Sequence, residues 1–236
     1  RNAHRSAVSA AVLGKLHPVY MMPEVDSYME IAMGIEPKTV EKALEQHPDA
    51  KAVLITSPTY YGVCSDLEKI ARMVHDKGKL LLVDEAHGSH FVFHRSLPIS
   101  AMEAGADMAA QSTHKTLPSM TGSSMLHVKG ERVDIEKLKF FLQLVQTTSP
   151  SHAMLASLDA ARYIMENYGH RLLDDCIKYS NKVRKEINDK TSFYCLGADK
   201  KDSFGIHDID PTRITVNLKG GGISGIKGEE ILRSEY

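Results

Sequence analysis

The fold is decided by two short stretches, LLLVDEAHG at residues 80–88 and AAQSTHKT at residues 109–116. Each begins with a short run of mostly apolar residues and ends in charged residues. Short apolar runs of this kind are typical of buried strands in a parallel sheet. Open α/β sheets bind ligands at the carboxyl ends of such strands. The two stretches therefore predict a site at one sheet edge that contains Asp84 and Lys115.

An aspartate and a lysine at one sheet edge are the pair that pyridoxal 5′-phosphate requires. The lysine amine forms a Schiff base with the cofactor, and the carboxylate keeps the pyridine nitrogen protonated, so that the ring acts as an electron sink. The spacing between Asp84 and Lys115 leaves room for a loop, a short helix and a strand, which is a normal α/β repeat. Charged residues also end strands in ordinary α/β proteins, so the spacing alone leaves that alternative open.

The chain resembles the major domain of the ornithine/lysine/arginine decarboxylases, and the resemblance runs over essentially its whole length. It rests on ordered motifs at 1–6 (RNAHRS), 57–63 (SPTYYGV), 83–91 (VDEAHGSHF), 112–117 (STHKTL), 147–151 (TTSPS) and 210–213 (DPTR). This resemblance implies a three-layer α/β fold of the aspartate-aminotransferase type, with a mostly parallel sheet flanked by helices. It also implies pyridoxal-phosphate-dependent decarboxylation of lysine, ornithine or arginine.

The resemblance implies a role for each motif residue. Lys115 holds the cofactor and is a candidate to protonate the product carbanion. Asp84 pairs with the pyridine nitrogen. His4 stacks on one face of the ring and Ala86 is small enough to lie under the other. For His4, the alternative from the residues alone is a histidine at a helix start that faces solvent.

The remaining candidates lie beside these residues. His87 can reach the cofactor O3′ or the substrate carboxylate. Ser112 and His114 flank the lysine and are candidates to bind the phosphate, and His114 has a second interpretation as a proton donor or acceptor. Thr59 lies in a loop that approaches the O3′ side, although that loop can equally be a simple turn.

Composition excludes several classes of protein. The 236 residues are 42% hydrophobic and 25% charged, with a formal net charge of −1, as in ordinary globular proteins. No basic block is present, so we expect no nucleic-acid partner. No apolar run approaches the length of about 20 residues that spans a membrane. We expect the three scattered cysteines to be free thiols in a reducing cytoplasm.

Hydrophobic periodicity predicts the order of elements. Strands are expected at 18–22, 51–56, 80–84, 106–111, 121–128 and 214–218. Helices are expected at 4–16, 36–46, 65–77 (with Ser65 as N-cap), 98–105 and 134–146, then from 151 to about 167, and at 170–188. We assign residues 1–150 to a partial cofactor-binding major domain. Residues 151–236 would be connecting helices and the start of a small C-terminal domain.

The chain starts within a motif, not at a methionine, and ends inside a predicted helix. We therefore expect a piece of a longer polypeptide that lacks the N-terminal part of the domain. The resemblance implies that the main phosphate-binding turn lies upstream of His4. It also implies that a second subunit completes the site, so we expect a homodimer or higher homo-oligomer. An incomplete domain exposes apolar surface and should self-associate.

Two further patterns do not support a site. His87, His90 and His94 have spacing that superficially resembles a metal site, but they follow a strand end and no cysteine or glutamate pattern surrounds them. We therefore expect no metal. Residues 220–225 (GGGISG) match a dinucleotide fingerprint, yet too few residues follow to complete the required unit. We expect a loop between elements of the small domain.

Two alternatives to a decarboxylase stay open. An aminotransferase or other enzyme of this fold would use the same lysine and aspartate, with Arg213 as the candidate for the substrate carboxylate. A non-catalytic module that binds cofactor poorly is the second alternative. Whether the chain alone binds pyridoxal phosphate would distinguish the second from the first.

Overall fold

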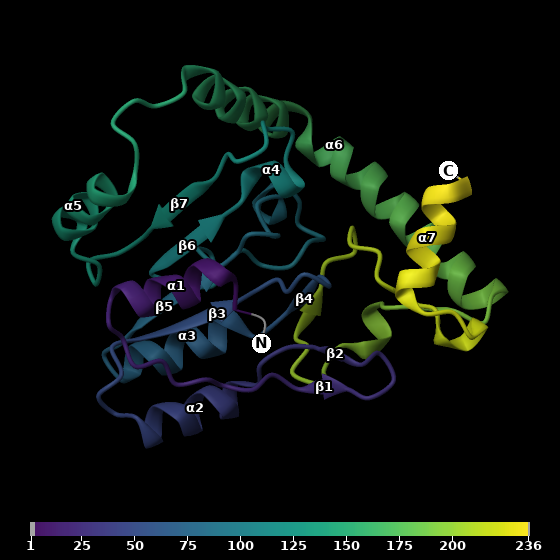
Figure 1. Ribbon diagram of the computed structural model, residues 1–236, viewed down its shortest axis with the longest axis horizontal. Helices are drawn as coiled ribbons and strands as arrows, with labels where there is room; N and C mark the ends of the chain where they lie inside the picture. Colours follow the sequence, from purple (N-terminus) through teal and green to yellow (C-terminus); the bar gives the residue numbers. More distant parts are fainter. Residues whose placement is uncertain (1–2, 236) are drawn as a thin grey trace.

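A computed structural model describes residues 3–235, so Arg1, Asn2 and Tyr236, including the first two positions of the RNAHRS motif, lie outside the described residues. A four-stranded sheet with strand order β3-β5-β6-β7 forms the centre (Figure 1). Strands β3, β5 and β6 are parallel and β7 is antiparallel to β6. Their bounds are Ala52–Thr56 (β3), Leu80–Asp84 (β5), Met108–Gln111 (β6) and Met125–Val128 (β7). The predicted α/β class with a mostly parallel sheet is confirmed.

Helices surround this sheet and extend away from it (Figure 1). The α-helices are α1 (Arg5–Leu13), α2 (Pro37–Gln46), α3 (Leu67–Asp76), α4 (Thr113–Thr116), α5 (Ile135–Val145), α6 (His152–Lys190) and α7 (Gly225–Glu235). Short 3-10 turns occupy Phe91–Phe93 (η1), Ala198–Lys200 (η2) and Lys219–Gly221 (η3).

Alternation along the strands decides which side chains enter the core. In β5, Leu81 and Val83 are buried, and they join one core cluster with side chains of α2 and α3. Each such aliphatic side chain stabilises the fold by about 1.5–3 kcal/mol. Leu82 and Asp84 project from the opposite face. Helix α1 lies across that face, where Ala7 and Leu82 line a common cavity. The sheet is therefore flanked by helices on both faces.

Three short antiparallel pairs lie outside the central sheet. They are β1 (Val25–Asp26) with β2 (Ile31–Ala32), β4 (Val63–Cys64) with β9 (Asp208–Ile209), and β8 (Tyr194–Cys195) with β10 (Val216–Asn217). One of them, β4 with β9, connects the C-terminal segment to the earlier part of the chain. Val63 and Ile209 also share a second core cluster with Met33 and Leu196. This cluster contains residues from both sides of the predicted boundary at residue 150. The division into two domains stays a prediction.

The two helices predicted for 151–167 and 170–188 are one continuous helix, α6, of 39 residues. The predicted interruption was wrong because Gly169 is buried inside the helix. An added Cβ there would lie 3.1 Å from Cε of Met165 and 3.5 Å from Cβ of Phe93. The glycine therefore permits close packing instead of ending the helix. The predicted break at 147–151 is confirmed between α5 and α6, where Ser151 caps the helix by accepting from the N–H of Met154.

Other predicted elements differ in detail. Residues 18–22 form no strand, because no described neighbour pairs with them, and the 98–105 segment forms no helix, with turns only at 101–105. Helix α3 is capped by Asp66, which accepts from the N–H of Lys69, and not by Ser65. The hydroxyl of Ser65 instead accepts the N–H of Ile35. The predicted strand at 121–128 is confirmed only over Met125–Val128.

The glycine run at 220–225 forms the η3 turn and leads into α7. A Cβ at Gly220 would lie 1.7 Å from the carbonyl oxygen of Ser192, and one at Gly221 would lie 2.3 Å from the Phe193 ring. The two glycines are thus explained by close packing against residues 192–193. This agrees with the predicted loop between elements.

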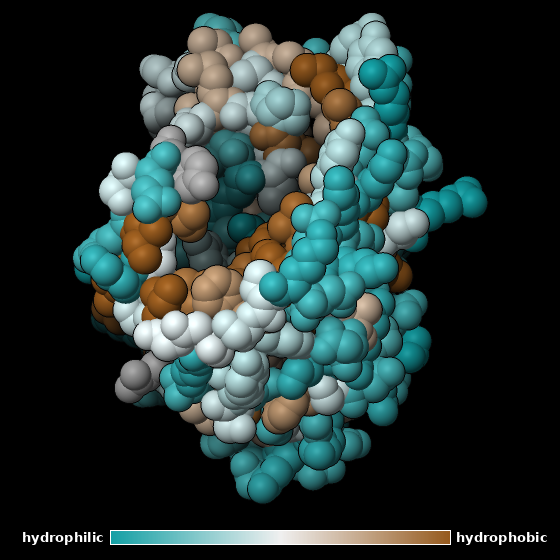
Figure 2. All heavy atoms as spheres, turned by 90° about the vertical axis from the view of Figure 1, so that its right-hand side faces the viewer, coloured by the Kyte–Doolittle hydropathy of each residue, from teal (hydrophilic) through white to brown (hydrophobic). Residues whose placement is uncertain are grey.

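The surface carries several features of note. Seen from the side that carries α6 and α7, the molecule is hollowed, with hydrophobic side chains along the rim of the hollow (Figure 2). Helix α5 buries none of its residues, and Phe140, Phe141, Leu144 and Val145 are all more than half exposed.

None of the described helices has the length and apolar character needed to cross a membrane. Cysteines 64, 176 and 195 are free thiols, as predicted.

Candidate functional site

The carboxyl ends of β5 and β6 meet at one edge of the sheet. Asp84 is the last residue of β5, and Ser112 directly follows β6 and precedes α4. Both contribute to a cavity of about 580 Å³ that extends over the α1 face of the sheet. His4, Ala86 and Lys115 line the same cavity. The structure therefore brings together five of the eight predicted site residues, which come from three segments of the chain.

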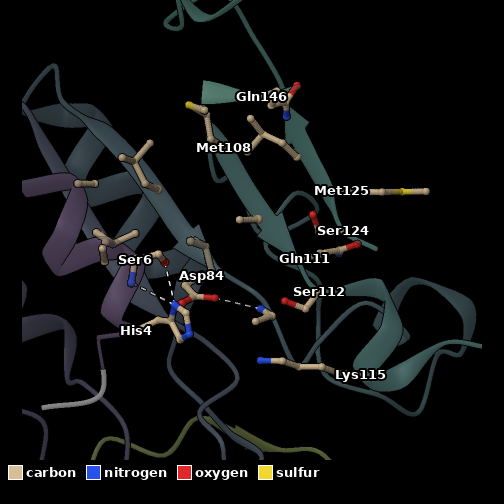
Figure 3. A pocket seen from close by; sticks show the side chains of 18 residues that line it. His4, Ser6, Asp84, Met108, Gln111, Ser112, Lys115, Ser124, Met125 and Gln146 are labelled. Carbon is tan, nitrogen blue, oxygen red and sulfur yellow. Dashed lines mark hydrogen bonds between the residues drawn. The ribbon is translucent and has the colours of Figure 1, made fainter. Parts of the chain in front are cut away.

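Asp84 reaches this cavity because of the strand alternation described above. One carboxylate oxygen, Oδ1, accepts the N–H of Ala86 at 3.2 Å, which fixes the carboxylate at the strand end (Figure 3). Asp84 itself lines the cavity. A carboxylate held in this way can accept a hydrogen bond from a protonated ring nitrogen.

His4 lies beside Asp84 at the start of α1 (Figure 3). Its Nδ1 accepts the backbone N–H of Ser6 at 3.2 Å and lies 2.8 Å from the Ser6 hydroxyl. The imidazole is thus the N-cap of α1, and this role fixes the orientation of its ring. The side chain is exposed, so both the predicted stacking role and the solvent-facing alternative agree with its position.

Lys115 lies on the single-turn helix α4, which follows β6 after one intervening residue, Ser112. Its amine points toward the side of the cavity where His4 and Asp84 lie (Figure 3). Nζ lies 3.3 Å from Nε2 of His87. Lys115 also lines a neighbouring cavity of about 320 Å³ together with Thr212 and Arg213. The Lys115 side chain therefore borders two cavities.

His87 is half-buried between two cations. Nδ1 lies 3.0 Å from Nη2 of Arg213, while Nε2 faces Lys115. The Tyr60 ring packs edge-on against the imidazole at 5.5 Å, and the Arg213 guanidinium lies 5.5 Å from the centre of the same ring. Burial, followed by the charges of Lys115 and Arg213, lowers the pKa of His87 to about 4, against the opposing charge of Asp210. His87 is therefore neutral at pH 7.

The remaining predicted residues lie apart from the main cavity. Nδ1–H of His114 donates to the carbonyl of Ser123 at 2.7 Å, and His114 does not line the cavity. The Thr59 hydroxyl accepts the N–H of Val63 at 3.2 Å, and Thr59 lines a separate small cavity. The cofactor contacts predicted for His114 and Thr59 thus have no support in this geometry.

The three closely spaced histidines point to different partners. His87 contacts Arg213, His90 pairs with buried Asp210 at 3.1 Å, and His94 pairs with Asp174 at 3.0 Å. His170 also approaches Asp174, so His94, His170 and Asp174 form a group with metal-ligand atoms. However, the N–H of Ser96 donates to Nδ1 of His94, which places the ring proton on Nε2. That nitrogen then donates to Asp174 and has no lone pair for a metal.

Sequence reasoning missed the roles of Tyr60, His90 and Asp210 around the site. Tyr60 belongs to the SPTYYGV motif and Asp210 to the DPTR motif, so their motifs were the available signal. Arg213 was considered only as a partner for a substrate carboxylate. The structure instead joins it to His87, from a position far along the chain.

Several known proteins are similar to this chain. Residues 1–215 match the family described as Orn/Lys/Arg decarboxylase, major domain. An arginine decarboxylase of Halalkalibacterium halodurans is 42% identical over 236 residues, which cover 100% of this chain and 48% of that protein. An inducible lysine decarboxylase of Escherichia coli is 29% identical over 202 residues, which cover 79% of this chain and 28% of that protein.

A solved structure, the constitutive lysine decarboxylase of E. coli, superposes with a TM-score of 0.72 at 24% identity. The match covers 91% of this chain and 35% of that one, and it shows the shared fold. The chain spans about half the length of the arginine decarboxylase that it matches. Because the family match extends over nearly the whole chain, the chain belongs to the Orn/Lys/Arg decarboxylase family.

Proposed function

We propose that the chain is the cofactor-carrying part of a pyridoxal-phosphate-dependent decarboxylase of a basic amino acid, with arginine as the first candidate substrate. The observation that carries this proposal is that Lys115 and Asp84 line one cavity at the carboxyl edge of the sheet. Arginine is favoured over lysine because identity is 42% to an arginine decarboxylase and 29% to a lysine decarboxylase.

The residues present fit the cofactor. The cavity of about 580 Å³ lies within the range of roughly 300–1,000 Å³ that is usual for small-molecule sites. It offers an amine, a carboxylate and a flat imidazole from three separate segments. When bound, the cofactor would supply an electron sink for the pair of electrons left by CO2.

Each side chain then has a defined task. The Lys115 amine would hold the cofactor covalently and return a proton to the substrate carbon. The Asp84 carboxylate would accept a hydrogen bond from the protonated pyridine nitrogen. His4 and Ala86 would orient the ring from its two faces, and Ser112 would contribute a hydroxyl to the phosphate. Neutral His87 would lie beside the reacting amine as a hydrogen-bond partner.

The position of Arg213 argues against an aminotransferase. A transaminase requires an arginine that is free to pair with the substrate carboxylate. Here the guanidinium is bound to His87 and packs over Tyr60. An ion pair with the carboxylate would also stabilise the ground state from which CO2 departs, which slows decarboxylation. An arginine bound to His87 avoids this effect.

We also propose that a second copy completes the site. Gln146, at the end of α5, lines the main cavity, so the 147–151 break lies next to the site. Helix α5 presents four largely exposed hydrophobic side chains beside this break. Such a surface is typical of a region that a partner covers.

The experiment is to add pyridoxal phosphate to the chain, reduce with borohydride and map the labelled peptide. We expect the label on Lys115, its loss in Lys115→Ala, and its retention in the control Lys182→Ala on the exposed surface of α6. Asp84→Asn should weaken cofactor retention on the order of 10-fold or more, because it removes the charged partner of the pyridine nitrogen. A label spread over many lysines would contradict the proposed role of Lys115. A folded chain that takes no label would favour the alternative of a module that binds cofactor poorly.

A further inference from the structure

We infer that Arg213 is a positioning residue that fixes the tautomer of His87, so that His87 presents Nε2–H to the amine of Lys115. The three groups form a chain of contacts, with 3.0 Å from Nη2 of Arg213 to Nδ1 of His87 and 3.3 Å from Nε2 of His87 to Nζ of Lys115. The inference concerns the geometry of the protein alone, and only its use in cofactor binding rests on the proposed function.

The direction of each hydrogen bond follows from the chemistry of its partners. A guanidinium donates and has no acceptor, so Nδ1 of His87 must accept from Arg213. A neutral imidazole then carries its single proton on Nε2. This N–H faces Nζ of Lys115 at 3.3 Å, whereas the contact that Nδ1 accepts from Arg213 is the shorter of the two, at 3.0 Å.

The other neutral tautomer of His87, with its proton on Nδ1, is disfavoured. If the Lys115 ammonium donated to Nε2, the ring proton would lie on Nδ1 and face a guanidinium N–H at 3.0 Å. A doubly protonated ring would face two cations, which agrees with the lowered pKa of His87. The other groups beside the imidazole are the Tyr60 ring and the carboxylate of Asp210. Asp210 is paired with His90 and Thr212, so it does not provide a hydrogen-bond acceptor to His87.

Arg213 is held firmly enough for this role. The buried side chain of Arg184 donates to the carbonyl of Arg213 at 2.9 Å and to that of Pro211 at 3.1 Å. The backbone N–H of Arg213 donates to the carbonyl of Asp210 at 3.2 Å. Its aliphatic stem passes close to Gly62, where an added Cβ would lie 2.8 Å from Cβ of Arg213. Long helix α6 and the 57–63 loop therefore fix the position of the guanidinium.

The test reads the tautomer of His87 directly, without cofactor. Two-bond ¹H–¹⁵N spectra of the chain with ¹⁵N-labelled histidine report which ring nitrogen carries the proton, and loss of the signal in His87→Gln assigns it. We expect the Nε2–H form in the wild type and a mixture or the Nδ1–H form in Arg213→Met. The control Arg171→Met, on the exposed surface of α6, should leave the spectrum unchanged. An Nδ1–H wild type, or an unchanged tautomer in Arg213→Met, would overturn the inference.

The outcome is separate from that of the proposed function. If the spectra show the expected tautomers while pyridoxal phosphate fails to label Lys115, the cofactor proposal fails and the positioning role of Arg213 stands.

Discussion

Nη2 of Arg213 lies 3.0 Å from Nδ1 of His87, although 126 residues separate the two in sequence. His87 follows β5 in the central sheet, whereas Arg213 follows β9, which pairs with β4. The buried pair of His90 and Asp210 joins the same two segments a few residues away. The environment of the reactive lysine therefore depends on docking of the C-terminal segment against the major domain.

Gly62 offers a test of this docking. Its φ is +84°, which disfavours side chains, and a Cβ would collide with that of Arg213. We expect Gly62→Ala to lower the free energy of unfolding by about 3 kcal/mol, from backbone strain and the collision together. Displacement of the Arg213 cation should also raise the pKa of His87 from about 4 toward its ordinary value. Urea denaturation and an NMR titration of His87 measure the two effects.

Gly78→Ala is the matched control. Gly78 also has a positive φ, +66°, but an added Cβ would meet nothing within 4 Å. Gly78→Ala should therefore lower the free energy of unfolding by the backbone strain alone, about 1 kcal/mol, and leave the titration of His87 unchanged. Equal costs for the two substitutions would show that Gly62 does not position Arg213.

Much of the sheet could be predicted from the sequence, because short apolar runs between turn residues define β3, β5 and β6. The charged residues that end two of these runs predicted Asp84 and Lys115 at one sheet edge, where both line the main cavity. The strand expected at 18–22 was wrong because apolar content cannot show whether a neighbouring strand is present. The break expected between 167 and 170 was wrong because the close packing of Gly169 inside α6 is visible only in three dimensions. The contact of Arg213 with His87 could not be predicted, because nothing local to either residue specifies the other.

The exposed face of α5 supports a prediction about association. Phe140 and Leu144 are 56% and 64% exposed and lie one helical turn apart. We expect the chain to form dimers or larger species in light scattering, because such apolar surface favours association. The double substitution Phe140→Glu with Leu144→Glu should shift the population toward monomer. Lys137→Glu adds a similar charge to an exposed position of α5 and should leave association unchanged. A monomeric wild type would contradict the prediction.

Glu85 provides a prediction about pH. It is 1% exposed, with one oxygen accepting the N–H of Ala101 and the other accepting from Gln111. Burial raises the pKa of Glu85 from its ordinary value of 4.5 to about 7. The unfolded chain therefore releases this proton at lower pH than the folded chain does. Glu85 therefore leaves the free energy of unfolding unchanged below pH 4.5. It lowers the free energy of unfolding as the pH rises from 4.5 to about 7.

The cost of ionising buried Glu85 should reach about 3 kcal/mol above pH 7, with roughly 1 kcal/mol of it appearing between pH 6 and pH 8. Glu85→Gln removes the titration, and the Gln111 amide can turn over to accept from the introduced amide. We therefore expect the difference in unfolding free energy between Glu85→Gln and wild type to shift in favour of the variant by about 1 kcal/mol from pH 6 to pH 8. Urea denaturation at both pH values measures this difference, in which contributions from other titrating groups cancel. Glu45→Gln, at an exposed position of α2, should show no such shift. A pH-independent difference for Glu85→Gln would mean that Glu85 titrates in the folded chain as it does in the unfolded one.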